Sequence, residues 1–173
     1  MNEALAGSFL KRRAQEVILA FCGQLKTSSL SLTFATLILF TGTKNAVLTA
    51  LQYSSGNIAT IPISPNAPQF IASAKSIQLH GSGPSKRQQH SHPHQVVVHQ
   101  EYQELLVPDL GSDKVHRLKR NDNGSWQLIG QVEFEPGGGP RHVAFHGKSS
   151  QFFPLSHFTL NGSCFRWISV YHP

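Results

Sequence analysis

The 173-residue sequence predicts an all-β protein, a partial β-propeller of about two four-stranded antiparallel blades. Three observations support this fold class. Charged residues form only 14 % of the chain, and 14 glycines and 10 prolines supply turns. Short apolar runs recur about every ten residues between those turns. A motif also repeats at an offset of 47 residues, which is the length of one blade.

Residues 1–46 differ from the rest and are predicted to form a divergent N-terminal segment, in which residues 1–25 can form a helix. Ser28–Phe40 is apolar but rich in Ser and Thr, and it is shorter than the ~20 residues that a membrane-spanning helix needs. A signal peptide would place its apolar core nearer Met1. The sequence therefore favours a buried strand pair or a poorly formed segment over a membrane or secretory role.

From residue 46 onward, each short apolar run predicts a strand. The predicted strands are Ala46–Gln52, Ile58–Ile63, Ser76–His80, His94–His99, Leu105–Leu110, Val115–Lys119, Trp126–Phe134 and Arg141–His146. The run Asn121-Asp122-Asn123-Gly124 is a hairpin turn signal. Strands at this spacing, joined by turns, are typical of an antiparallel meander.

An internal repeat favours a propeller among the possible meanders. Pro93–His99 and Pro140–His146 share the first Pro, a Val and the last His at an offset of 47. Gly81–Pro84 matches Gly137–Pro140 at a longer offset, which the polar insert Ser85–Ser91 explains. Propeller repeats are ~40–50 residues long, so the period corresponds to one blade.

The repeat places His94 and Arg141 at equivalent positions, each just before the first strand of a blade. Because first strands line the central channel of a propeller, both side chains are expected at the same mouth of it. Arginine binds a carboxylate or phosphate bidentately, and histidine moves a proton near neutral pH. The pair therefore suits an anionic substrate. The alternatives are a hydrogen-bonded turn residue for His94 and a surface ion pair for Arg141.

The net charge of +6 is unevenly distributed, because no acidic residue occurs between Glu16 and Glu101. Such a balance suits nucleic acid or an anionic substrate, but the Lys and Arg residues are scattered and form no basic helix. We therefore expect no nucleic-acid partner. Cys22 and Cys164 lie far apart, which excludes a zinc ribbon and a disulfide-rich scaffold.

Four closely spaced histidines raise the alternative of a transition-metal site, since neutral imidazole is a common ligand. They are His90, His92, His94 and His99. Pro93 interrupts their alternation, and no Cys, Asp or Glu nearby completes a ligand shell. We therefore predict no metal site.

Four motifs together carry a family resemblance. They are Gly81-Ser82-Gly83-Pro84, Ser91-His92-Pro93-His94, Leu106-Val107-Pro108-Asp109-Leu110-Gly111-Ser112-Asp113 and Gly139-Pro140-Arg141-His142-Val143. In this order and spacing, the chain resembles the seven-bladed propeller lactonase family, which includes 6-phosphogluconolactonases and fungal carboxy-cis,cis-muconate cyclases. The resemblance covers residues 47–147, about two blades, and leaves residues 148–173 as an unrelated tail.

The resemblance implies cofactor-free hydrolysis of a small anionic lactone such as 6-phosphogluconolactone, with muconate-lactonising isomerisation as the alternative. His94 matches the family's active-site histidine, and Arg141 matches its substrate-binding arginine. His92 and His142 are further substrate-binding candidates. The resemblance also implies a cytoplasmic protein without a membrane partner.

The remaining motif residues are expected to shape the backbone. Asp109 and Asp113 should stabilise a turn between two strands, and the glycines at 137–139 should let the chain bend tightly before Arg141.

The chain also departs from the family pattern. The family has an active-site Glu in a later Val-Asn-Glu-Leu motif, whereas this sequence has no carboxylate after Glu135. The later family arginine is also absent. Seven blades of this period need about 330 residues, so we expect an incomplete propeller. An inactive fragment that acts only in interactions is therefore the alternative to an enzyme.

Overall fold

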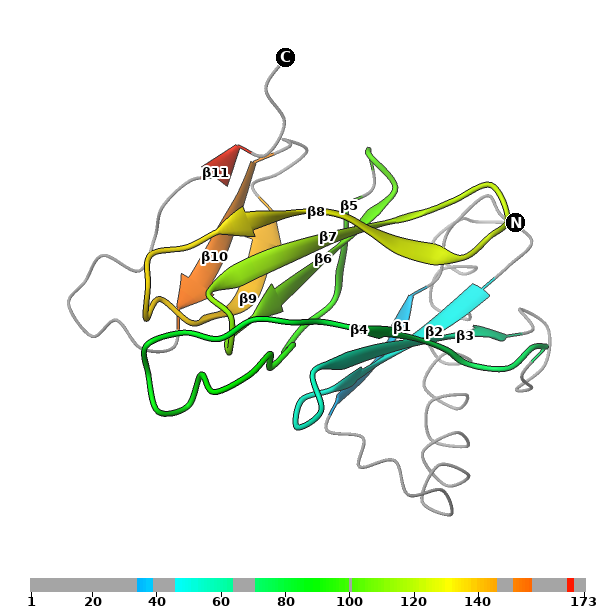
Figure 1. The fold of residues 1–173 in the computed structure, drawn as a ribbon. Coiled ribbons are helices and arrows are strands. Elements are labelled where there is room, and N and C mark those ends of the chain that lie inside the picture. The colour runs from blue at the N-terminus through cyan, green and yellow to red at the C-terminus, as the bar shows by residue number, and fades with distance from the viewer. Residues whose placement is uncertain are drawn as a thin grey trace.

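The computed structural model describes residues 34–38, 46–63, 71–99, 101–145, 151–156 and 168–169, and all of its elements are strands in antiparallel sheets (Figure 1). The first sheet contains β1 (Phe34–Ile38), β2 (Ala46–Gln52), β3 (Asn57–Ile63) and β4 (Lys75–Gln78). The middle sheet contains β5 (Val97–His99), β6 (Glu104–Asp109), β7 (Lys114–Arg120) and β8 (Trp126–Glu133). The third contains β9 (Pro140–Phe145), β10 (Gln151–Ser156) and β11 (Ile168–Ser169).

Every strand in these sheets neighbours the next strand along the chain, so each sheet is a meander. The middle sheet lies between the other two (Figure 1). Two consecutive four-stranded meanders followed by the start of a third are the blades of a β-propeller. The predicted fold class, an all-β partial propeller, is therefore confirmed. The helix considered for residues 1–25 lies outside the described residues.

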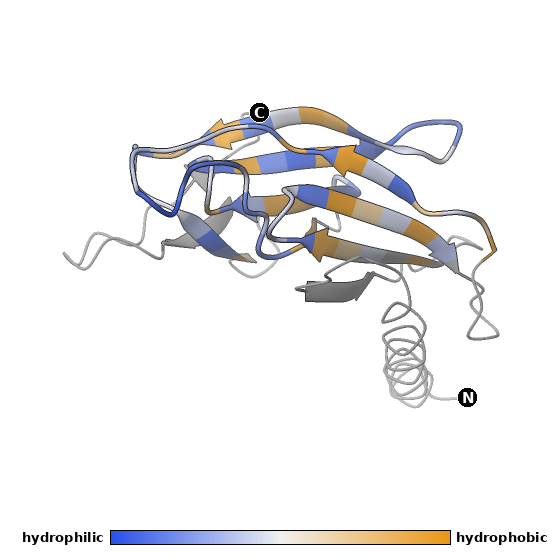
Figure 2. Cartoon of the chain, turned by 60° about the horizontal axis from the view of Figure 1, so that its bottom comes forward, coloured by the Kyte–Doolittle hydropathy of each residue, from blue (hydrophilic) through white to orange (hydrophobic). Residues whose placement is uncertain are grey.

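The core consists of two apolar layers, one on each face of the middle sheet. Along β6, Leu105 and Val107 pack against the first sheet, whereas Leu106 packs against β9. The first layer adds Leu51, Ile58, Leu79, Val96, Leu118 and Trp126, and the second adds Val115 and Val143. A strand buried on both faces is apolar at every position rather than at alternate ones, which explains the run Leu105-Leu106-Val107. Figure 2 shows apolar and polar residues succeeding each other along the strands.

The eight predicted strands correspond to β2 through β9, and β2 has the predicted bounds. The largest difference is at β5, which begins at Val97 instead of His94. Here Pro93 forms only an isolated bridge with Asp109, and the N–H of His94 donates to the carbonyl of Pro108 at 3.0 Å. Pro93 has no N–H to extend the ladder, so this segment follows the end of β6 without joining the sheet.

The first and third sheets take strands from beyond residues 47–147. β1 pairs with β2 from Phe34↔Leu51 to Ile38↔Val47, within the segment for which a strand pair was one alternative. β10 pairs with β9, although no strand was predicted there. The domain boundaries themselves stay a prediction.

The predicted hairpin turn between β7 and β8 is confirmed. The N–H of Asn121 donates to the carbonyl of Ser125, and the N–H of Gly124 donates to that of Asn121, both at 2.9 Å. Gly124 has a φ of 79°, which glycine adopts at little cost. Within the described part of the chain, the structure contains no helix of the length and apolar character needed to cross a membrane.

Candidate functional site

His94 and Arg141 come from consecutive blades and meet at the ends of their innermost strands. The Nε of Arg141 donates a hydrogen bond to Nε2 of His94 at 2.8 Å, and both residues are half-buried. An arginine Nε always carries hydrogen, so Nε2 of His94 is the acceptor and the neutral ring has its proton on Nδ1. The expected convergence of these two side chains is confirmed, whereas their roles stay predictions.

Hydrogen bonds on two sides hold the segment that carries His94. The N–H of His94 donates to Pro108 at the end of β6, as described above. The side chain of the next residue, Gln95, accepts a hydrogen bond from the N–H of Val143 in β9 at 2.7 Å. The 94–95 segment is therefore tied both to its own blade and to the strand that carries Arg141.

His142 also lies beside His94, with ring centroids 5.0 Å apart in an edge-on arrangement. Burial lowers the pKa of His142, and the positive charge of Arg141 lowers it further. The neutral form is therefore favoured beside the guanidinium. His142 contributes a ring edge to the site without adding a second positive charge.

His92 approaches the site through Tyr53, a residue that the sequence analysis did not single out. The two rings stack with centroids 4.4 Å apart, and Nδ1 of His92 donates to the carbonyl of Tyr53 at 2.8 Å. Tyr53 also meets His94 edge-on at 6.2 Å. Tyr53 lies in the turn between β2 and β3, so the first blade contributes to the site as well. No local motif marks this residue, because only the packing of blades brings it to His92.

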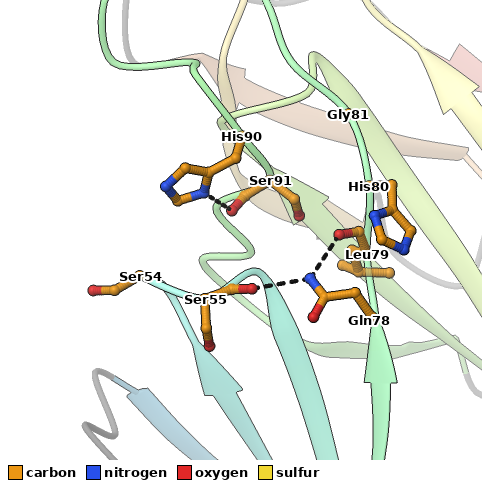
Figure 3. Close-up of a pocket in the computed structure, with 8 residues that line it drawn as sticks. All are labelled: Ser54, Ser55, Gln78, Leu79, His80, Gly81, His90 and Ser91. Atoms are coloured by element: carbon orange, nitrogen blue, oxygen red, sulfur yellow. Dashed lines mark hydrogen bonds between the residues drawn. The ribbon is translucent and has the colours of Figure 1, made fainter.

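A pocket of about 320 Å³ lies between the β2–β3 turn, the end of β4 and the segment at His90 (Figure 3). It is lined by Ser54, Ser55, Gln78, Leu79, His80, Gly81, His90 and Ser91. The ring of His90 lies 4.1 Å from that of His92, centroid to centroid, which connects the pocket to Tyr53 and His94. Neither His94 nor Arg141 lines this hollow, so we place the candidate site at the pair because of its chemistry and not at the pocket.

Asp109 at the end of β6 is fully buried and accepts several hydrogen bonds. Its donors are the hydroxyl of Ser91 at 2.6 Å, the N–H of His92 at 2.6 Å, the N–H of Gly111 at 3.0 Å and Nε2 of His116 at 3.0 Å. Burial raises the pKa of Asp109, but hydrogen bonds from His116, Ser91 and the His92 N–H outweigh that effect and hold the pKa below its usual value. The carboxylate is therefore ionised inside the protein.

Asp113, at the start of β7, is also buried and contacts a different part of the chain. It accepts hydrogen bonds from the N–H groups of Gly137 and Gly139 at 2.7 Å each, and from the side-chain amide of Gln88 at 2.5 Å. Asp109 and Asp113 were expected to stabilise their own turn. Asp109 does so through the N–H of Gly111 and also bonds to the distant Ser91 and His92. The hydrogen bonds of the Asp113 carboxylate given above go instead to distant segments.

The histidines considered for a metal site take separate roles. Nε2 of His94 is engaged by Arg141, and His99 packs edge-on against Tyr102 and Phe145. Burial lowers the pKa of His99, and nearby charges only partly offset this. Within the described ranges, no group of three or more His, Cys, Asp or Glu residues is arranged to hold a metal ion.

Two consecutive four-stranded meanders and the start of a third are the blades of a β-propeller. Arg141 and His94 meet where the second of these sheets adjoins the third. Comparison with known proteins identifies its family. The family model described as "Lactonase, 7-bladed beta-propeller" matches residues 22–157, and the chain belongs to this family.

Three similar proteins illustrate the relationship. The 6-phosphogluconolactonase of Bacillus subtilis is 35 % identical over 111 residues, which are 64 % of this chain and 31 % of that protein. A solved structure from Lactobacillus plantarum has a TM-score of 0.58 and 27 % identity, over 65 % of this chain and 32 % of that one. The periplasmic gluconolactonase of Pseudomonas aeruginosa has a TM-score of 0.53 and 26 % identity, over 70 % and 38 %. The chain thus spans about a third of these relatives.

Proposed function

We propose that this chain carries the anion-binding and proton-transferring residues of a lactonase that hydrolyses a sugar-acid lactone such as 6-phosphogluconolactone. The observation that carries the proposal is the 2.8 Å hydrogen bond between Arg141 and His94. It brings a permanent cation and a neutral imidazole together at the inner strands of two blades. The family relationship and the names of the relatives support the same reaction class.

Arg141 binds the anionic group of the substrate. A guanidinium has five N–H donors in a planar fork that matches a phosphate or carboxylate, and the Nε of Arg141 donates to His94. Lysine would keep the charge but lose the fork, so the two residues are not equivalent at such a site. Because the neutral form of His142 is favoured, its ring adds no second positive charge beside Arg141. The guanidinium is therefore the main source of positive charge in the site.

His94 acts as the base at Nε2, because its Nδ1 is buried. An anionic substrate competes for the Arg141 guanidinium and thereby releases the lone pair of Nε2. Nε2 then takes a proton from a water molecule as the water oxygen bonds to the lactone carbonyl carbon. The ring C–O bond breaks, and the proton passes to the departing oxygen, which gives the open hydroxy acid without any other reactant.

The first experiment is lactone hydrolysis by the purified chain, with folding followed by circular dichroism. His94→Gln should lower kcat by about 10²–10⁴-fold, the usual contribution of a general base, and Arg141→Lys should mainly raise KM. Arg87→Lys, at an exposed arginine, is the matched control and should behave as the wild type. A folded wild-type chain without turnover, or a His94→Gln chain with unchanged turnover, would refute the proposal.

Two finer points belong to the same proposal. Carboxy-cis,cis-muconate should be assayed beside the sugar lactone, since turnover of muconate alone would favour an isomerase over a hydrolase. We also propose a cytoplasmic location, although one similar protein is described as periplasmic. Fractionation of the source cells tests the location, and recovery of the chain in the periplasm would contradict it.

A further inference from the structure

We propose that Asp109 and Asp113 are positioning residues that jointly set the distance between His94 and Arg141. The functional purpose of this positioning rests on the proposed function, whereas the hydrogen bonds that support it do not depend on that function. The two carboxylates lie at the ends of one short turn between β6 and β7: Asp109 is the last residue of β6, and Asp113 is the residue before β7. Each of them holds one of the two segments that deliver the pair.

Asp109 holds the segment before β5. It accepts hydrogen bonds from the hydroxyl of Ser91 and the backbone N–H of His92, which lies two residues before His94. The carbonyl of His92 in turn accepts a hydrogen bond from the N–H of Leu110 at 3.2 Å. These contacts fix the backbone of the histidine segment against the end of β6.

Asp113 holds the segment before Arg141 in the same manner. It accepts hydrogen bonds from the N–H groups of Gly137 and Gly139, and Gly139 lies two residues before Arg141. Both glycines have positive φ values, 81° and 53°, a backbone conformation that other residues adopt only at a cost. In this conformation their N–H groups donate to the Asp113 carboxylate. The carbonyl of Asp113 also accepts the N–H of Phe134 at 2.8 Å, which fixes the end of β8.

The two anchors form one rigid unit because the turn between them is tightly packed. A Cβ on Gly111 would lie 1.8 Å from the carbonyl oxygen of His90, so the turn and the histidine segment are in direct backbone contact. Gln88 donates to both Asp113 and the carbonyl of Leu110, which braces the turn from the other side. His116 supports Asp109 from within β7. A displacement of either carboxylate would therefore move one partner relative to the other.

The experiment observes the Arg141–His94 hydrogen bond directly, by ¹⁵N NMR of the full chain. The Arg141 Nε–H signal is assigned by its loss in Arg141→Lys, and the His94 Nε2 signal by its loss in His94→Gln. In Asp109→Asn and in Asp113→Asn, both signals should shift and the Arg141 Nε–H should exchange faster with water. Asp122→Asn, at an exposed aspartate in the β7–β8 turn, is the matched control and should leave both signals unchanged.

Two milder substitutions test the same inference if either asparagine variant fails to fold. Ser91→Ala removes a single hydrogen bond from Asp109, and Gly137→Ala strains the backbone that Asp113 holds, with only Pro84 near the new Cβ at 3.6 Å. Smaller shifts of the same two signals are expected in both. Unchanged signals in folded variants of either anchor would overturn the inference.

The NMR readout also separates this inference from the proposed function. If the chain binds no lactone but the signals respond as expected, the anchoring is correct and the proposed function is wrong. If the chain is active, Asp113→Asn should mainly raise KM, because it displaces Arg141, and Asp109→Asn should mainly lower kcat, because it displaces His94. If the two variants instead changed kcat and KM to the same extent, the aspartates would have a general structural role, and this would contradict separate positioning of His94 and Arg141.

Discussion

The middle sheet contains two hairpin turns of similar composition and very different surroundings. The β6–β7 turn, residues 110–113, contains Gly, Ser and Asp, as does the β7–β8 turn, residues 121–125. The first is buried, and the side chains of Asp113 in the turn and of Asp109 just before it bond to segments more than 15 residues away. The second is partly exposed and is held mainly by its own residues, such as the Ser125 N–H that donates to Asn121 and Asn123.

The amino-acid composition of a turn therefore does not by itself determine its role in the fold. Both turns satisfy their own backbone, but only the β6–β7 turn ends between the loops of two blades. Asp109 and Asp113 therefore accept hydrogen bonds from the segments that carry His94 and Arg141. From the β7–β8 turn, the hydroxyl of Ser125 reaches the first sheet, where it accepts a hydrogen bond from the Lys75 amine.

The largest difference between the turns should appear on removal of a carboxylate charge. Asp109→Asn should lower the free energy of unfolding by about 3–5 kcal/mol, because it leaves His116 and several buried donors without their ionised acceptor. Asp122→Asn should change it by no more than about 0.5 kcal/mol. Urea denaturation followed by circular dichroism measures both values. Similar losses in the two variants would remove the distinction between the turns.

A smaller but still clear difference is expected on adding a methyl group to the buried turn. Gly111→Ala places a Cβ 1.8 Å from the backbone oxygen of His90, which cannot move aside as a side chain could. Overpacking of this kind costs about 1–3 kcal/mol or more. Gly130→Ala in β8 meets nothing within 4 Å and is the matched control. Thermal unfolding of both variants checks this, and a Gly111→Ala chain as stable as Gly130→Ala would contradict the close contact.

The pH dependence of stability should also show the contribution of Asp109, beside the buried turn. The pKa of Asp109 is held below its usual 3.8, so the unfolded chain binds the proton first as the pH falls. The stability that Asp109 contributes is therefore complete above about pH 3.8 and is lost as the pH falls through the folded-state pKa. Burial lowers the pKa values of His99 and His142 below 6.5, which predicts an earlier loss as the pH falls below that value. Urea denaturation across this pH range, with Asp109→Asn as comparison, measures both losses.

If Asp109→Asn and the wild-type chain lose stability in parallel below pH 3.8, Asp109 contributes nothing to acid sensitivity. The loss below pH 6.5 should persist in Asp109→Asn, because it arises from the two histidines.

The smallest effect is expected in the exposed turn. Asn121→Ala removes the side-chain oxygen that accepts the N–H of Ser125 at 2.8 Å. Because Asn123 accepts from the same N–H, the loss should be about 0.5–1 kcal/mol. Urea denaturation measures it, and a loss as large as that of Asp109→Asn would show that the two turns are equally important to the fold.

Much of the fold follows from the sequence because the strands of a meander are separated by local turn signals. Gly124 with its positive φ ends one such run, and the predicted strands on either side of it match β7 and β8 closely. β10 was missed because its run contains Pro154 and follows no turn signal of the same kind. β5 begins late because Pro93 interrupts the ladder, which depends on the partner strand and not only on local sequence.

The candidate site was predictable only as far as the repeat reached. An offset of 47 residues puts His94 and Arg141 at equivalent places in two blades, and equivalent places in neighbouring blades are close in space. Tyr53 has no counterpart in that repeat, so its stacking on His92 emerged only from the packing of blades. The contacts of Asp113 with Gly137 and Gly139 likewise depend on three-dimensional neighbours that no motif encodes.

The central claim is that Arg141 and His94 form an anion-binding site for a sugar-acid lactone, and the most direct measurement is a titration with 6-phosphogluconate, the hydrolysis product. The ¹⁵N signals of Arg141 Nε and His94 Nε2 should shift together and saturate as the phosphate draws the guanidinium away from the imidazole. Arg141→Lys should abolish the shift of the His94 signal, and Arg87→Lys should leave it intact. If both signals stay unchanged at saturating concentrations in a folded chain, this pair does not bind the substrate.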